Sequence, residues 1–262
     1  MVKIMKANYH THTPLCRHAW GSEEEYIQKA IKEGLEILGF SDHAPHVFAV
    51  ENFDSPARMN ISEIGSYFET LLALREKYKD HIQILIGFET EYYPLLWEKT
   101  RQVYKNYPLD YLILGNHQIG NESISAINSF AATKDENVLK SYVDHCIAAI
   151  NTEKISFIAH PDVINFVGDG ETYSSEMSRL ILRANELHIP LEINMYGLRE
   201  NRAYPRSDFW TLAGKLGATA ILGCDCHRIE HVADQAEIRQ ATEYAARFGL
   251  KTVDVIKLKS PF

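Results

Sequence analysis

Short apolar runs alternate with helix-length amphipathic segments seven times along this chain of 262 residues. The runs are mostly apolar throughout rather than at every second position, which is typical of strands covered on both faces. Strands that alternate with helices pair in parallel, and the connecting helices cover the sheet. We therefore expect an α/β protein that forms a single-domain distorted (β/α)7 TIM-like barrel over residues 1–262.

The limits of these elements follow from apolar periodicity and from helix-capping signals. We expect strands within residues 1–13, 35–40, 82–91, 109–114, 155–159, 190–193 and 219–223, and a short terminal strand over 252–258. We expect helices over residues 22–34, 61–78, 95–106, 135–151, 174–187, 207–216 and 232–248. Ser22 and Glu25 have the spacing of a capping box, and Gly34 is a suitable helix stop. Loops are expected over residues 44–60, 118–134, 163–173 and 195–205.

Composition argues against several classes of protein. The chain has 27 Lys and Arg against 35 Asp and Glu, a formal net charge of −8, so it lacks a basic stripe for nucleic acid. Its four cysteines show no CxxC spacing, and its first residues form no apolar leader. No apolar run approaches the ~20 residues that span a membrane. We expect a reduced cytoplasmic protein that binds neither nucleic acid nor a membrane.

Two motifs near opposite ends of the chain each hold two potential metal ligands. His10 and His12 are two residues apart, and so are Asp225 and His227. Residues i and i+2 of an extended strand point the same way, so each pair can face a single point. If the two strands are neighbours, four potential ligands converge.

Polar side chains also follow the other predicted strands. In α/β barrels the functional residues lie at the carboxyl ends of the strands. Imidazole and carboxylate groups are suitable ligands for divalent metals, so a set of them at these ends predicts a multinuclear metal site. The residues at these ends, or just beyond the first strand, are His10, His12, His18, Asp42, His43, Glu89, Glu91, His117, His160, Asn194, Asp225 and His227.

The opposing interpretation is structural. A single buried histidine is more often a hydrogen-bonded core residue than a ligand, so the prediction depends on the whole set. His46 lies close enough to the predicted site to be ambiguous. Cys224 and Cys226 alternate with the second ligand pair, so we expect them to face away, and Cys16 is the thiol best placed to be a ligand.

Taken in order, these motifs resemble those of the polymerase and histidinol phosphatase (PHP) superfamily over essentially the whole chain. They are His-Thr-His at 10–12, Phe-Ser-Asp-His at 40–43, Gly-Phe-Glu at 87–89, the isolated His117 and His160, and Asp-Cys-His at 225–227. The stretches at 10–18, 87–92 and 107–117 are similar to those of monofunctional histidinol-phosphate phosphatases. Asn116 departs from the Ser-Val pair expected before the histidine, which leaves the ligand set intact.

The resemblance implies a trinuclear site that holds three divalent ions, which could be Zn, Fe, Mn or Co. One ion would be held by His10, His12, Glu89 and Asp225. A second would share Glu89 and add His117 and His160. A third would be held by His18, His43 and His227. These nine residues are called the candidate ligands below.

Substrate contacts are also implied. Phosphate monoesters hydrolyse very slowly in water, and metals together with an arginine can neutralise the phosphate oxygens. We expect Glu89, Asp225 and Arg199 to be catalytic. We expect Arg199, Arg17, Arg58, Glu91 and Asn194 to bind the substrate, with an exposed arginine or a structural salt bridge as the alternatives. Asp42 could support a ligand from behind, and Asp162 could protonate the leaving group or simply hold a loop.

Three functions remain open at this point. The resemblance favours a metal-dependent phosphatase that converts L-histidinol phosphate to L-histidinol and phosphate in histidine biosynthesis. The same site could act on a nucleotide or another small phosphoester, although the net charge argues against a long nucleic acid. The third possibility is a non-catalytic metal-binding module, which the complete ligand set argues against.

Overall fold

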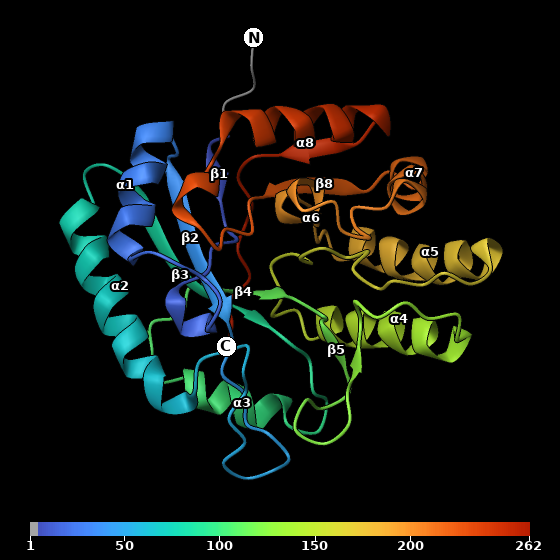
Figure 1. Ribbon diagram of the computed structural model, residues 1–262, viewed down its shortest axis with the longest axis horizontal. Coiled ribbons are helices and arrows are strands. Elements are labelled where there is room, and N and C mark those ends of the chain that lie inside the picture. The colour runs from blue at the N-terminus through green and yellow to red at the C-terminus, as the bar shows by residue number, and fades with distance from the viewer. Residues whose placement is uncertain (1–4) are drawn as a thin grey trace.

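A computed structural model describes residues 5–262, so the first four residues of the predicted strand region 1–13 lie outside the described part. Parallel strands form the centre of the molecule and helices cover them on the outside (Figure 1). The central strands are β1 (Ala7–Asn8), β2 (Ile37–His43), β3 (Gln83–Thr90), β4 (Tyr111–Leu114), β7 (Leu191–Asn194), β8 (Thr219–Gly223) and β9 (Lys251–Val253). The helices are α1 (Glu23–Glu33), α2 (Ile64–Tyr78), α3 (Trp97–Tyr104), α4 (Glu136–Asn151), α5 (Gly170–Glu186), α6 (Met195–Arg199), α7 (Ser207–Lys215) and α8 (Gln235–Arg247).

The strands form a curled parallel sheet. Ladders join β1, β2, β3 and β4 in that order, and a second set joins β7, β8 and β9. Ile158 connects the two sets, because it bridges to Leu114 on one side and to Leu191 on the other. On the opposite side a bridge from Thr11 to Cys226 brings the segment after β1 beside the segment after β8. The seven-stranded barrel expected from the sequence is therefore only partly observed, as a half-barrel sheet whose halves meet through single bridges.

Two expectations about the strands need correction. The predicted strand at residues 155–159 is not a ladder strand, because only Ile158 pairs with bridge geometry on either side. Its backbone still bonds to both neighbours, for example from Ser156 N to Leu112 O at 2.8 Å. The predicted loop at 118–134 contains a small antiparallel pair, β5 (Gln118–Ile119) and β6 (Ile127–Asn128), which is too short to leave a periodic signal.

Several helix limits were predicted correctly, and others differ by a few residues. The capping box of α1 is confirmed: Ser22 accepts a bond from Glu25 N, and Glu25 accepts one from Ser22 N. Gly34 follows in the left-handed region with φ of +83°, which glycine adopts without a steric penalty. The predicted loop at 195–205 begins with α6, and α5 starts at Gly170, earlier than expected. Short 3-10 turns lie at Pro14–Cys16, Ile61–Glu63 and Ile229–His231.

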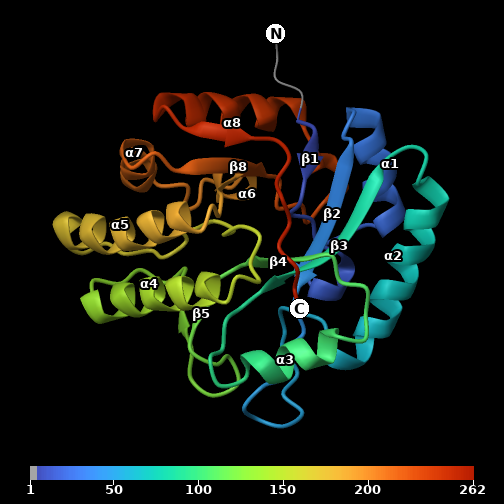
Figure 2. The same ribbon diagram turned by 180° about the vertical axis from the view of Figure 1, so that it is seen from behind.

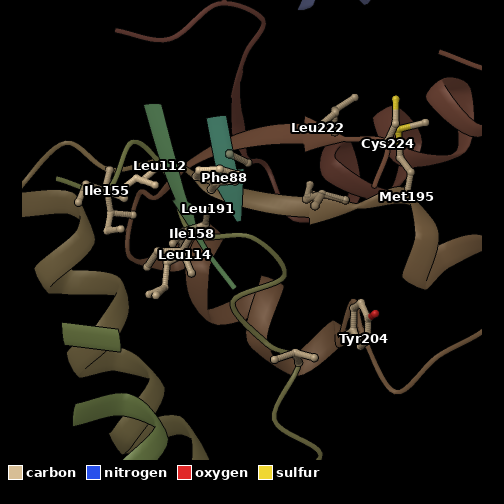
Figure 3. Close-up of a cluster of buried hydrophobic side chains, with 14 of the residues drawn as sticks. Phe88, Leu112, Leu114, Ile155, Ile158, Leu191, Met195, Tyr204, Leu222 and Cys224 are labelled. Carbon is tan, nitrogen blue, oxygen red and sulfur yellow. The ribbon is translucent and has the colours of Figure 1, made fainter. Parts of the chain in front are cut away.

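The core lies on both faces of the sheet. Between the strands and the outer helices, side chains such as Leu112, Ile158 and Leu191 pack together although they come from distant segments (Figure 3). A smaller cluster that includes Tyr9, Tyr111 and Phe157 packs separately. The single hydroxyl proton of Tyr111 lies between the carbonyl oxygens of Tyr9 and Phe40, at 2.7 and 3.1 Å from the phenol oxygen, so this buried phenol is satisfied.

The view from behind shows helices around the sheet on both sides and the C-terminal segment crossing its strands (Figure 2). Among residues 5–262, no helix combines the length and the apolar character needed to cross a bilayer. The arrangement directs the carboxyl ends of the parallel strands toward one region, where the predicted polar side chains lie.

Candidate metal centre

The structure brings all nine candidate ligands together. His10 and His12 follow β1 and place their Nε2 atoms 3.2 Å apart. The Nε2 of His12 lies 3.1 Å from Asp225 Oδ1, although the two residues are more than two hundred positions apart in sequence. The parallel bridge between the segments after β1 and β8 causes this meeting, as the two-motif pattern predicts.

Glu89, at the end of β3, occupies the middle of the set and is almost fully buried. Its Oε1 lies 2.9 Å from His160 Nε2 and 3.3 Å from His117 Nε2. Its Oε2 lies 3.5 Å from His10 Nε2. A Cβ at Gly115 would lie only 2.3 Å from Glu89 Oε1, so the glycine leaves the room that this carboxylate occupies.

The remaining histidines form a stack at the edge of the cluster. The ring of His18 lies 4.7 Å from that of His227, and the ring of His227 lies 4.1 Å from that of His12. The ring of His43 lies 5.3 Å from that of His18. The nine side chains therefore form one continuous group.

The residues fit divalent metal ions. Glu89 Oε2, Asp225 Oδ1, His43 Nδ1 and His227 Nε2 are buried and have no hydrogen-bond partner. His43 Nδ1 lies 2.9 Å from Glu89 Oε2 without the alignment of a hydrogen bond. Buried polar atoms without partners are costly. A cation between them would remove this cost.

The charge balance of the buried region also favours cations. Within residues 5–262, six buried carboxylates accompany a single buried arginine, Arg58. The carboxylates belong to Asp42, Glu89, Glu91, Asp162, Glu192 and Asp225. Ions bound by the neutral imidazoles and the carboxylates would compensate this excess of negative charge.

The negative charge of the buried carboxylates also changes the pKa values of the imidazoles. Burial lowers the pKa of His12, but the carboxylates of Asp225 and Asp42 beside the ring outweigh it and raise the pKa to about 9. Burial likewise opposes protonation of His117, and the charges of Glu89 and Glu91 raise its pKa to about 10. Without metal ions, the rings of His12 and His117 therefore bind protons, and the protons compensate the negative charge that metal ions would otherwise compensate.

Three carboxylates stand behind candidate ligands and hold their rings. Glu91 Oε1 lies 2.8 Å from His117 Nδ1. Glu192 Oε1 lies 2.8 Å from His10 Nδ1. Asp42, which the sequence analysis considered as a support for a ligand, accepts a bond from Thr13 N and lies 3.5 Å from His12 Nδ1. Such partners set which ring nitrogen is free for a metal.

The cluster opens into a cavity of about 330 Å³, a size suited to a small molecule. The cavity is lined by candidate ligands and by side chains that the sequence analysis did not select. Among the latter are Gln118, Glu122, Phe130, Tyr196, Arg202 and Tyr204.

The predicted arginines occupy different places. Arg199 does not line this cavity; its Nη1 donates to Glu237 at 2.8 Å. Arg17 forms an ion pair with Glu63 outside it. Arg58 does line the cavity, but it is buried and its guanidinium already bonds to Ala44 O, Glu91 and Glu122.

Arg202, which the sequence analysis did not select, lines the cavity. Its guanidinium donates to Tyr196 Oη at 2.9 Å, and both residues line the cavity. It lies three residues beyond Arg199 in the same segment after β7, so the sequence pointed to the segment but could not select between the two.

Glu91 and Asn194 do not line the cavity and lie behind the candidate ligands. Asn194 Nδ2 donates to Asp225 Oδ2 at 3.0 Å and to Glu192 Oε2 at 2.9 Å. The sequence analysis did not select Glu192, whose signal was a single acid between the apolar residues Leu191 and Ile193 of β7.

The remaining titratable candidates have structural partners. His46 is buried, and its Nε2 accepts a hydrogen bond from Glu91 N at 3.3 Å. Asp162 accepts a bond from Arg206 N at 2.5 Å, does not line the cavity, and burial raises its pKa to about 7. Cys16 is buried, and its sulfur lies within 4.8 Å of a ring nitrogen of each of His18 and His227. Cys224 and Cys226 lie in the hydrophobic core.

A curled parallel α/β sheet with histidines and carboxylates gathered at the carboxyl ends of its strands is the arrangement of a metal-binding α/β protein. The chain belongs to the PHP domain family, whose match covers residues 8–196. The resemblance drawn from the motifs is thereby confirmed.

Individual relatives are similar over most of the chain. A probable histidinol-phosphatase of Deinococcus radiodurans is 25% identical over 224 residues, which cover 84% of this chain and 85% of that protein. A probable histidinol-phosphatase of Schizosaccharomyces pombe is 24% identical, and the match covers 97% of this chain and 90% of that protein. The structure of the histidinol phosphate phosphatase of Lactococcus lactis was solved with zinc, L-histidinol and phosphate. It superposes on this chain with a TM-score of 0.72 at 21% identity, and the superposition covers 97% of this chain and 99% of that one. The last likeness shows a shared fold.

Proposed function

We propose that this protein is a metal-dependent phosphatase that hydrolyses L-histidinol phosphate to L-histidinol and phosphate in histidine biosynthesis. The observation that carries the proposal is the convergence of nine candidate ligands from distant segments in one cluster, seven of which line a small cavity. The names of the D. radiodurans and S. pombe relatives support the choice of substrate.

Three divalent ions would be held by the candidate ligands. His10, His12, Glu89 and Asp225 would hold the first, and Glu89 would share the second with His117 and His160. His18, His43 and His227 would hold the third. Such ions supply positive charge for the phosphate oxygens and lower the pKa of a water molecule, which is the chemistry that monoester hydrolysis needs. Zn, Fe, Mn and Co all suit these donors, and zinc in the L. lactis enzyme favours zinc.

The chain's own residues would bind and orient the phosphate. Arg202 is the arginine of the segment after β7 that lines the cavity, so we assign to it the anion-binding role first expected of Arg199. Its hydrogen bond to Tyr196 holds the guanidinium in place. A planar guanidinium can donate two parallel bonds to a phosphate.

We also propose that residues 1–262 form one domain with a distorted (β/α)7 barrel. The ladders and single bridges described above support this arrangement, because Ile158 joins the β1–β4 ladder to the β7–β9 ladder on one side and Thr11 pairs with Cys226 on the other. Its partner would be a small phosphorylated molecule rather than a nucleic acid.

A steady-state comparison of substrates tests the function. Purified, metal-loaded protein would be assayed with L-histidinol phosphate, nucleoside monophosphates and other small phosphomonoesters. We expect the highest kcat/KM for L-histidinol phosphate. A preference for a nucleotide would establish the alternative phosphoesterase, and no turnover of any ester by protein with bound metal would support a non-catalytic module.

A further inference from the structure

Glu192 is a buried carboxylate that contacts two candidate ligands without being one of them. It is fully buried in β7, and both of its carboxylate oxygens accept hydrogen bonds. Oε1 lies 2.8 Å from His10 Nδ1, while Oε2 accepts from His160 N at 3.0 Å. One carboxylate on one strand therefore fixes two candidate ligands that follow other segments of the sheet.

Asn194, two residues further along β7, extends this network to a third ligand. Its Oδ1 accepts a bond from Gly197 N at 2.8 Å, so the orientation of the amide is set by the first turn of α6. Its Nδ2 then donates to Glu192 Oε2 at 2.9 Å and to Asp225 Oδ2 at 3.0 Å. Asp225 Oδ1 is left without a hydrogen bond and faces His12.

We infer that Glu192 is a positioning residue that prepares His10, His160 and, through Asn194, Asp225 for metal binding. An ionised carboxylate accepts hydrogen bonds and donates none. In the neutral His10 ring that a metal ion binds, the hydrogen bond to Glu192 places the proton on Nδ1 and leaves the electron pair of Nε2 directed toward the cluster. The inference rests on the proposed metal site and adds to it the residue that organises it.

Glutamine cannot replace Glu192 in either orientation. If the amide oxygen faces His10, the amide nitrogen meets two other donors, His160 N and Asn194 Nδ2. If the amide is reversed, its nitrogen donates to His10 Nδ1, which forces the ring proton onto Nε2. The near-isosteric change Glu192→Gln therefore removes the ability to satisfy all three donors without removing bulk.

A second variant reaches the same carboxylate from a neighbouring strand. A Cβ at Gly223, in β8, would lie 1.7 Å from Glu192 Oε1. Gly223→Ala must therefore displace the carboxylate while leaving its chemistry unchanged. Glu237→Gln is the matched control, because Glu237 also lies 2.7 Å from a histidine Nδ1, that of His231, but contacts no candidate ligand.

The test measures metal binding by full-length protein that has been stripped with a chelator. Each protein is titrated with Co²⁺ while the visible absorption of the bound ion is recorded, and Zn²⁺ affinity is measured against a chromophoric chelator. We expect Glu192→Gln and Gly223→Ala to lower metal affinity about 10- to 100-fold and to alter the cobalt spectrum, and Glu237→Gln to match the unmodified protein.

Each outcome has a distinct meaning. Unchanged affinity and spectrum in Glu192→Gln would overturn the inference, and if that variant does not fold, the same readings on Gly223→Ala decide. Equal losses in Glu237→Gln would also overturn it, because the effect would not be specific to the network. If the unmodified protein binds no Co²⁺ or Zn²⁺, the proposed metal-dependent function itself fails.

Discussion

The hydrogen bond that one ring nitrogen of a histidine makes sets which nitrogen is free to bind a metal. In this chain each of three ligand rings has a carboxylate against its Nδ1, contributed by Asp42, Glu91 or Glu192. Asp42 and Glu91, which lie close to candidate ligands in the sequence, therefore hold the rings of candidate ligands and are not candidate ligands themselves. Their arrangement specifies ring orientation at the cost of burying extra negative charge, which cations in the cluster would compensate.

Glu89 should be the most sensitive candidate ligand, because both of its oxygens face histidines of different proposed ions. We expect Glu89→Gln to lower kcat at least about 10²- to 10³-fold, since an amide cannot supply the charge that the site needs. Metal content should fall in parallel when measured by elemental analysis. Normal metal content with full activity would remove Glu89 from the centre of the site.

At the scale of elements, the short segment after β7 decides which arginine reaches the cavity. One turn of α6 directs Arg199 toward Glu237 of α8, while Arg202, beyond the turn, lines the cavity wall. A helix of five residues is set by its packing and by the Asn194 cap rather than by its own propensity. Sequence position alone could not separate the two side chains.

This placement predicts opposite kinetic results for the two arginines. Arg202→Ala should lower kcat/KM about 10- to 100-fold, mainly through KM, because a hydrogen bond to a charged group contributes about 1.5–3 kcal/mol. Arg199→Ala should leave KM nearly unchanged, since its charge is already paired with Glu237. A raised KM in Arg199→Ala with a normal KM in Arg202→Ala would reverse the assignment.

Helix α1 provides a test of the local structure away from the site. Ser22→Ala removes a side chain that accepts a hydrogen bond from Glu25 N and should cost about 1 kcal/mol of the free energy of unfolding. Denaturant titration of metal-loaded protein would measure this loss. Steady-state kinetics should be unaffected, because Ser22 does not line the cavity.

At the scale of the whole molecule, the metal ions should act as links between its two sheet segments. Glu89 belongs to the β1–β4 ladder and Asp225 follows β8, so ions between them would join halves that meet otherwise through single bridges. Ligands that bind only the folded state stabilise it. Removal of the metals should therefore weaken the entire fold.

The predicted observation is a pH-dependent loss of thermal stability after chelation. In metal-free protein His12 and His117 have pKa values raised to about 9 and about 10, above the ~6.5 of an unfolded chain. Their stabilisation is complete below pH ~6.5 and is lost as the pH rises through 9 and 10. Tm should fall over that range by roughly 2–4 °C for each kcal/mol lost.

Metal-loaded protein provides the comparison for this measurement. Its imidazoles would already be neutral and bound, so its Tm should change much less between pH 6.5 and 10. Scanning calorimetry on both forms would show the difference. Identical curves with and without chelator would count against metal ions as part of the folded protein.

The sequence by itself determined the alternation of strands and helices, the capping of α1, and the set of potential ligands at the strand ends. These features depend on periodicities of two and 3.6 residues and on local capping chemistry, all of which are visible within about ten residues. The family motifs extended this reading to the residues expected to hold metal.

Only the tertiary structure decided which side chains contact the candidate ligands from the side away from the cavity. Glu192 and Gly223 meet because two parallel strands lie side by side, and no local pattern encodes that contact. The irregular segment around Ile158 and the division of roles between Arg199 and Arg202 likewise depend on packing between segments distant in sequence. Contacts of this kind are set by the three-dimensional arrangement of several elements at once, so a residue's type and spacing cannot reveal them.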